Sequence, residues 1–283
     1  MSTTLSPSYW TFTSLGICMS STQIALSVYI LQMYLFKNKS YNSKMEYQLI
    51  FFRVLLDVLY GVCGFTYYSS GIPILILSLP YDITFATGVV TQNVLEMRSF
   101  LAAIIAIERA LAAAVPLKFY KLRSQISNLP IILFIASTGL MIDIALFGIC
   151  GFRFPLAPGC NSVTCAVPTC YVTYTAITRV IYSSTNAFFS GLLCHKLLKK
   201  SNSKNVSMDF RKANWLSLTD GVSTLFFDLL PTLIFNSGLI DVKGRGPVMG
   251  GVRQTGRALE AVMVVVLMKK KPAVDTRTSV VVY

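Results

Sequence analysis

Long apolar runs recur along the whole chain and constrain its fold more than any other feature. A helix needs about 20 apolar residues to cross a ~30 Å hydrocarbon core. Stretches of that length occupy residues 12–36, 48–70, 82–112, 129–150, 169–197, 216–239 and 248–268. Only 13% of the 283 residues are charged, against about 25% in a soluble domain. We therefore expect an all-α membrane protein, a bundle of seven transmembrane helices.

The segment between the second and third apolar runs is apolar but interrupted. Residues 71–81 read GIPILILSLPY and contain Pro73 and Pro80. Proline removes a helical hydrogen bond and clashes with the preceding turn. The segment is also too short to cross a bilayer, so we expect a loop at the membrane surface.

Lysine and arginine are distributed very unevenly outside the apolar runs. Seventeen lie in the loops and the C-terminal end on one side, and three lie on the other, namely Arg153, Lys243 and Arg245. Because basic loops stay in the cytoplasm, we expect the N-terminus outside and the C-terminus inside. Residues 1–268 then form the transmembrane domain in the lipid bilayer, and 269–283 form a short cytoplasmic tail.

The net charge of +13 has a second reading, binding to nucleic acid. The basic residues sit in short clusters between apolar runs, and no nucleic-acid-binding module is recognisable. We therefore expect no nucleic-acid partner.

The third apolar run ends in IERALAAAVPLKFY, residues 107–120, where an acid and an arginine stand side by side. Glu108 and Arg109 resemble the acid–arginine pair that ends the third helix of rhodopsin-like G-protein-coupled receptors. Pro116 and Leu117 match the Pro-Leu that follows it in those receptors, with the proline seven residues past the arginine. The alternative is that the pair only marks where a helix leaves the bilayer.

Two further positions support the resemblance, and several depart from it. Asp57 lies mid-run in FFRVLLDVLYG, and Pro231 lies in FFDLLPTLIF, as an aspartate and a kink proline do in such receptors. The last run lacks N-P-x-x-Y, the fourth lacks tryptophan, the first lacks asparagine, and no cysteine begins the third. The whole pattern is more similar to the nematode serpentine chemoreceptors, class BC, in which FRxxxDxxYG and ER…P…Y recur.

This resemblance implies a multi-pass chemosensory receptor of the plasma membrane. It also implies a location in the sensory cilium. It implies a small extracellular ligand and a heterotrimeric G protein as partners, without a cofactor, metal or enzymatic activity. At rest the arginine would be held by its acidic neighbour and by the sixth helix, and agonist would release it to the G protein. The implied coupling residues are Glu108, Arg109, Pro116, Leu117 and Tyr120.

Charged residues inside the apolar runs form a second group of candidates. An unpaired arginine at mid-bilayer costs at least ~2.5–3.5 kcal/mol, so each should face the bundle interior and find a partner. Depths estimated at ~1.5 Å per residue predict the cross-helix pairs Asp57–Arg98 and Asp228–Arg257. We predict a polar layer that repacks on activation, although a purely structural role is the alternative. Its members are Arg53, Asp57, Arg98, Asp228, Pro231, Arg257 and Glu260.

A third group lies nearer the expected outer side. Arginines mixed with aromatic residues between helix ends suit a small anionic or polar ligand. The alternative is that the aromatic residues are anchors at the lipid interface. The candidate ligand residues are Glu96, Asp143, Tyr174, Arg179 and Arg253.

Three cysteines cluster in the second outer loop, in an oxidising compartment. They are Cys160, Cys165 and Cys170. We expect one disulfide among them and leave the pairing open, with three free thiols as the alternative. Their spacing of five does not match a zinc site.

Other seven-helix functions fit less well. The last run has no lysine before Lys269 to bind retinal, and no internal repeat suggests the halves of a transporter. An odorant-gated channel of the insect type would place the N-terminus inside, against the charge count. A transporter or ligand-gated channel stays the second hypothesis.

Overall fold

The computed structural model describes residues 7–37, 45–77, 82–123, 125–154, 163–200, 208–236 and 248–269. Within these ranges the chain is helical and contains no strand, which confirms the all-α class. The elements are α1 (Pro7–Lys37), α2 (Met45–Leu77), α3 (Asp82–Ala114), α4 (Pro116–Arg123), α5 (Leu129–Asp143), η1 (Ile144–Ile149), α6 (Val163–Ala166), α7 (Thr169–Lys200), α8 (Met208–Thr224), η2 (Leu225–Leu229), α9 (Leu230–Asn236) and α10 (Val248–Lys269). The two η segments are π-helical.

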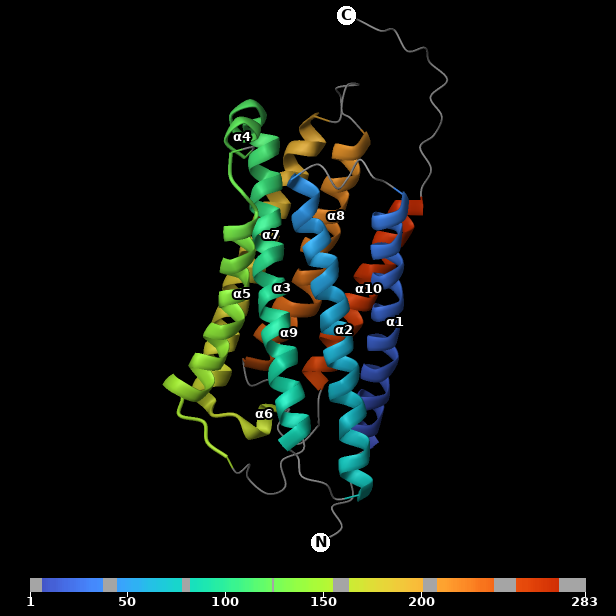
Figure 1. The fold of residues 1–283 in the computed structure, drawn as a ribbon, viewed down its shortest axis with the longest axis vertical. Helices are drawn as coiled ribbons and strands as arrows, with labels where there is room; N and C mark the ends of the chain where they lie inside the picture. The colour runs from blue at the N-terminus through green and yellow to red at the C-terminus, as the bar shows by residue number, and fades with distance from the viewer. Residues whose placement is uncertain are drawn as a thin grey trace, which may run out of the picture.

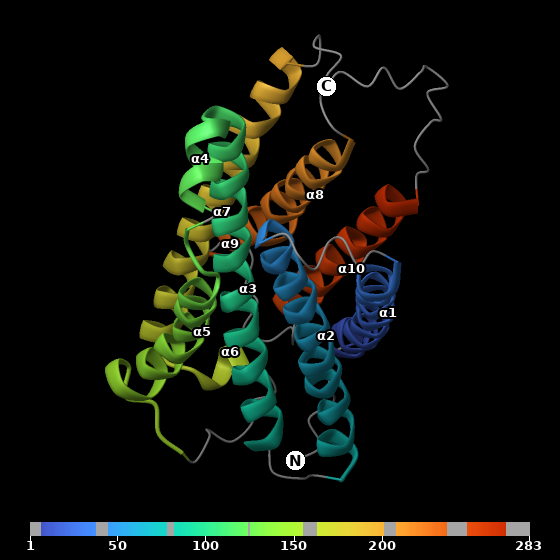
Figure 2. The ribbon, with the colours of Figure 1, turned by 45° about the horizontal axis from the view of Figure 1, so that its top comes forward.

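The long helices run side by side and form one bundle (Figures 1 and 2). α3 lies in the middle and packs against α2, α5, α7 and α8, while α1 packs against α2 and α10. α8 closes the bundle between α7 and α10. We call the end of the bundle that holds α6 the α6 end, and the opposite end, which holds α4, the α4 end (Figure 1).

Four helices are long and apolar enough to cross a membrane by length and composition. They are Tyr9–Met33, Gln48–Gly71, Leu129–Ile149 and Ser217–Phe235. α3, α7 and α10 are 33, 32 and 22 residues long, which at ~1.5 Å per residue also suffices for the hydrocarbon core. Their lower hydropathy follows from charged and hydroxylated side chains turned into the bundle.

The expected loop at 71–81 is wrong for its first part. α2 continues through Pro73 to Leu77, and residues 78–81 lie outside the described chain. Pro73 stands about one turn before the end of the helix, so it removes a single backbone hydrogen bond there and does not end the helix. The apolar composition of the segment outweighs that loss.

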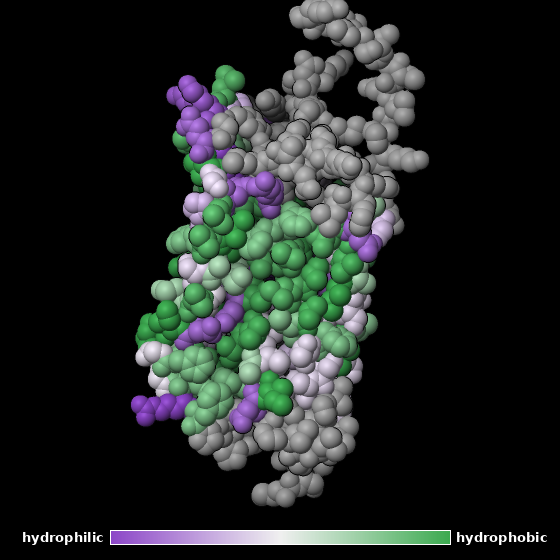
Figure 3. Space-filling model, viewed as in Figure 1, coloured by the Kyte–Doolittle hydropathy of each residue, from purple (hydrophilic) through white to green (hydrophobic). Residues whose placement is uncertain are grey.

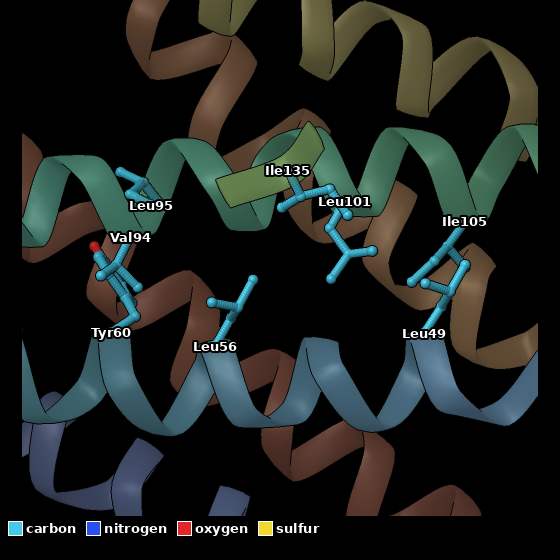
Figure 4. Packing of buried hydrophobic residues seen from close by; sticks show 8 residues of the cluster. All are labelled: Leu49, Leu56, Tyr60, Val94, Leu95, Leu101, Ile105 and Ile135. Atoms are coloured by element: carbon cyan, nitrogen blue, oxygen red, sulfur yellow. The ribbon is translucent and has the colours of Figure 1, made fainter. Parts of the chain in front are cut away.

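The apolar core lies mainly between α2 and α3. Leu49, Leu56 and Tyr60 of α2 point toward α3, and Ile135 of α5 joins them (Figure 4). The outer surface of the bundle is also apolar: hydrophobic residues cover most of the middle of the face in Figure 3. Residues on α5 such as Leu133, Phe134 and Leu140 are more than 60% exposed. A bundle that is apolar outside and charged inside suits a lipid environment.

Candidate functional site

Seven charged side chains meet in the interior. They come from α2, α3, α10 and the continuous rod of α8, η2 and α9, which we call the sixth rod. We call this group the central network: Arg53 and Asp57 of α2, Arg98 of α3, Asp220 of α8, Asp228 of η2, and Arg257 and Glu260 of α10. All are buried except Asp57, whose side chain is 17% exposed. Each member lies more than one turn from both ends of its helix or rod, so the network occupies the middle of the bundle.

Arg98 is the hub of the central network and one of its most buried members, at 0% exposure. Its Nε pairs with Asp57, as the depth estimate predicted. Its Nη2 donates to both carboxylate oxygens of Glu260, at 2.9 and 2.8 Å, and lies 3.4 Å from Asp220 Oδ1. One guanidinium thus joins α3 to α2, α8 and α10.

The other two arginines complete the network. Arg53 donates to Asp220 Oδ1 at 2.8 Å and pairs with Glu260. Arg257 pairs with Asp228, again as predicted, and donates to Glu260 at 3.0 Å. Each carboxylate of the network other than Asp57 therefore contacts at least two arginines.

Asp220 is the member that sequence analysis did not assign. Arg53, Arg98 and Arg257 all lie within 4 Å of its Oδ1, and Asn186 of α7 donates to its Oδ2 at 3.0 Å. The signal was present, because an aspartate inside an apolar run needs a buried partner. Depth alone gave it no partner, since depth does not fix how each helix is rotated.

The sixth rod is irregular where it meets the network. Asp228 lies in the π-helical η2, and Pro231 stands in the first turn of α9 directly after it. Gly256 of α10 faces Phe227 of η2 so closely that a side chain at 256 would collide with it. The missing side chain lets α10 approach η2, which brings Arg257 to Asp228. π-bulges and prolines are the usual places where helices bend.

Nearer the α6 end lies a second, smaller group, which we call the outer cluster: Glu96, Arg179 and Arg253. Arg179 Nε lies 3.7 Å from Glu96 Oε2, beyond hydrogen-bond distance, and its Nη2 donates to Gln92. Arg253 Nη2 donates to Thr232 at 3.1 Å, and its Nε lies 3.6 Å from Asp228 Oδ1. The charges of Arg253, Arg179 and Glu96 interact with one another.

The other two predicted ligand residues lie beside this cluster. Asp143 accepts a hydrogen bond of 2.8 Å from Asn93 of α3. Tyr174 is half-buried and packs against the apolar cluster around Phe85. Tyr171, which is 3% exposed, interacts electrostatically with Arg179 and Glu96, and Tyr174 interacts with Glu96.

At the α4 end, the acid–arginine pair Glu108–Arg109 lies in the last two turns of α3. Arg109 is 6% exposed. Glu108 forms an ion pair of 2.8 Å with Arg123, a partner that the sequence did not suggest. Arg123 also donates to Ile126 O at 2.9 Å and to Asn128, and Asn128 donates to Gln48 of α2 at 2.7 Å. The end of α3 is thereby tied to the segment after α4 and to α2.

The remaining predicted coupling residues lie on α4. Pro116 is its first residue, a position that suits proline because that N–H has no helical partner. Leu117 is 89% exposed, and α4 packs against α3. Tyr120 lies in the helix, but its side chain is outside the described part of the structure.

A family model described as serpentine type 7TM GPCR chemoreceptor Srbc matches residues 5–272. The chain belongs to the Srbc family of serpentine chemoreceptors. No curated protein matches it. Membership makes the chain a multi-pass membrane protein of a receptor family and supports a chemosensory role.

The disulfide of this receptor corrects the sequence-based expectation. Cys170, at the start of α7, is bonded to Cys150, at the end of η1. Cys170 is therefore unavailable to Cys160 or Cys165; Cys160 and the side chain of Cys165 lie outside the described chain. Cys150 was missed because it ends the fourth apolar run and was counted with that run. The bond fastens the end of η1, which continues α5, to the start of α7.

Proposed function

We propose that this Srbc chemoreceptor crosses the plasma membrane seven times with its α6 end outside. A small extracellular ligand binds between the helix ends there, and a heterotrimeric G protein binds at the α4 end. Family membership supports the receptor role, and the excess of basic residues in the loops toward the α4 end supports the orientation. The Cys150–Cys170 bond agrees with it, since disulfides persist on the oxidising side.

The observation that carries this proposal is the position of Glu108 and Arg109. They lie in the last two turns of α3, the helix that contacts most of the bundle, and α4 with its exposed Leu117 packs against this helix. A buried guanidinium at a helix end, with five donors on a planar fork, can change partners while it stays charged. Outward movement of α8 would give Arg109 a new partner in the G protein.

A receptor of this kind needs a resting and an active packing of its helices, and in our proposal the two differ in the ion pairs of the central network. Three arginines share Asp220 and Glu260, so small helix shifts can exchange one ion pair for another without leaving a charge alone. The cost of repacking is then small compared with that of breaking a buried pair. A ligand has to supply only the difference in its affinity for the two packings. η2 and Pro231 are the places where the sixth rod would bend.

The test is the pair of substitutions Arg109→Ala and Arg109→Lys, measured as G-protein activation at matched surface levels. Both should lose most of the signal, because lysine keeps the charge but not the forked donors. Lys118→Ala, an exposed basic residue on α4, is the matched control and should signal normally. A full response from Arg109→Lys would show that the Glu108–Arg109 pair only marks where the helix leaves the bilayer.

A further inference from the structure

The outer cluster is buried but poorly satisfied. Glu96 is 2% exposed, its carboxylate oxygens make no hydrogen bond of good geometry, and its ion pair with Arg179 is long, at 3.7 Å. The Nε atoms of Arg179 and Arg253, which have carboxylates only at 3.7 and 3.6 Å, and the hydroxyl of Tyr171 are buried and lack a hydrogen-bond partner. A buried polar group without a partner costs about 1–3 kcal/mol, and more when it is charged. This concentration of unmet donors and acceptors is the signature of a site that a ligand completes.

The charge of the outer cluster is unbalanced toward the positive. Arg179 and Arg253 repel each other, and Glu96 is the single carboxylate among the three members. Asp228 balances the charge of Arg253 only in part. Its Oδ2 forms an ion pair with Arg257, and its Oδ1 stays 3.6 Å from Arg253. Arg253 thus has no carboxylate at hydrogen-bond distance, and an added anion would relieve both the repulsion and the unmet donors.

Asp228 connects this site to the central network. Its two oxygens face Arg253 in the outer cluster and Arg257 in the network, which are one helical turn apart on α10. An anion bound to Arg253 would take the place of Asp228 there and leave Asp228 to Arg257 alone. Since Asp228 lies in η2, just before Pro231, that exchange acts on the least regular part of the sixth rod.

We propose that the ligand of this site is a small organic anion, a carboxylate that binds Arg253 and Arg179 and displaces Asp228 from Arg253. The inference rests on the proposed receptor function and narrows its ligand class. Arg253 lies five residues into α10, about 7 Å along the helix from its first residue. A cation would meet two arginines against one carboxylate, Glu96, so the charge of the cluster favours an anion.

The probe is a set of straight-chain carboxylates from propionate to octanoate, each with the primary amide and the primary amine of the same chain length. Binding is measured to the purified full chain in detergent, as the shift in its melting temperature and by calorimetry, without G protein. We expect at least one carboxylate to bind, with its amide and amine bound roughly tenfold or more weakly, because a hydrogen bond to a charged group is worth about 1.5–3 kcal/mol.

Three variants locate the site. Arg253→Gln should abolish the preference for carboxylate over amide, and Arg253→Lys, which keeps the charge in case the first variant does not fold, should retain a weaker preference. Glu96→Gln should bind the carboxylate several-fold more tightly, since the competing charge is gone. Asp82→Asn is the control: Asp82 is exposed at the start of α3, at the same end of the bundle, and the variant should bind like the unmodified chain.

Equal binding of acids and amides, binding of none of the carboxylates, or a full carboxylate preference in Arg253→Gln would overturn the inference. These results are separable from failure of the receptor proposal. A chain that binds carboxylates but activates no G protein would contradict the proposed function alone. A chain that signals in response to an uncharged ligand would contradict the anion inference alone.

Discussion

The central network and the outer cluster are built from the same residue types and lie one helical turn apart on α10, yet they are satisfied very differently. In the network, every carboxylate pairs with an arginine, and the buried side-chain atoms without a hydrogen-bond partner are only Arg53 Nε and Arg98 Nη1. In the outer cluster, both oxygens of Glu96 and the Nε atoms of both arginines lack one.

The difference separates two uses of buried charge. A saturated network holds helices together and limits them to a few packings, because any lone charge in it is costly. An unsaturated cluster contributes little to stability and is open to a ligand that supplies the missing partner. Asp228 contacts both groups, so a change in the outer cluster would reach the central network through Asp228.

The largest effect should follow from Arg98→Gln. It removes the hub and leaves Asp57, Asp220 and Glu260 with one partner fewer, so we expect a destabilisation of about 3–5 kcal/mol and little receptor at the cell surface. Asp57→Asn is the milder comparison, because Asp57 is partly exposed and Arg98 keeps Glu260. The double variant should be milder than the sum of the two. Strict additivity in melting temperature or surface level would argue against direct contact.

A smaller effect, confined to the α6 end, should follow from Cys150→Ser. The bond closes a loop of 20 residues, and its loss should lower stability by about 3 kcal/mol in the chain-entropy model. Because the bond fastens the ends nearest the outer cluster, ligand potency should fall while the maximal G-protein response is kept. Dose–response curves at matched surface levels check this, with Cys194→Ser as the free-thiol control. An unchanged potency would show that the disulfide does not support the ligand site.

The smallest effect should follow from Arg123→Gln at the α4 end. Its ion pair with Glu108 is partly exposed on the glutamate side, at 20%, and such pairs contribute about 1 kcal/mol or less. We expect a modest rise in basal G-protein activity, because Glu108 would hold the end of α3 less firmly. Basal second-messenger levels, compared with those of Lys121→Gln on the same helix, measure it. A basal activity below that of the unmodified receptor would show that Arg123 serves the active state.

The sequence predicted the pairs Asp57–Arg98 and Asp228–Arg257 because depth along nearly straight, antiparallel helices is a simple count of residues. It did not predict the partners of Arg53 or the role of Asp220, because these depend on the rotation of each helix about its axis. The Arg123–Glu108 pair was also missed, since it requires α4 to fold back against α3. Pro116, a good first residue for a helix, was the available signal for α4. The predicted coupling and ligand-binding roles stay predictions.

The most direct test of the distinction between the two regions is one substitution made in both, Glu260→Gln and Glu96→Gln. The two glutamates are 3% and 2% exposed, so burial does not distinguish them. Melting temperatures of the purified receptor should fall steeply for Glu260→Gln, by the equivalent of about 3–5 kcal/mol, because three arginines lose a shared partner. Glu96→Gln should change stability by less than about 1 kcal/mol, since the charge it removes has only a long ion pair of 3.7 Å with Arg179. Equal losses from the two substitutions would contradict the account.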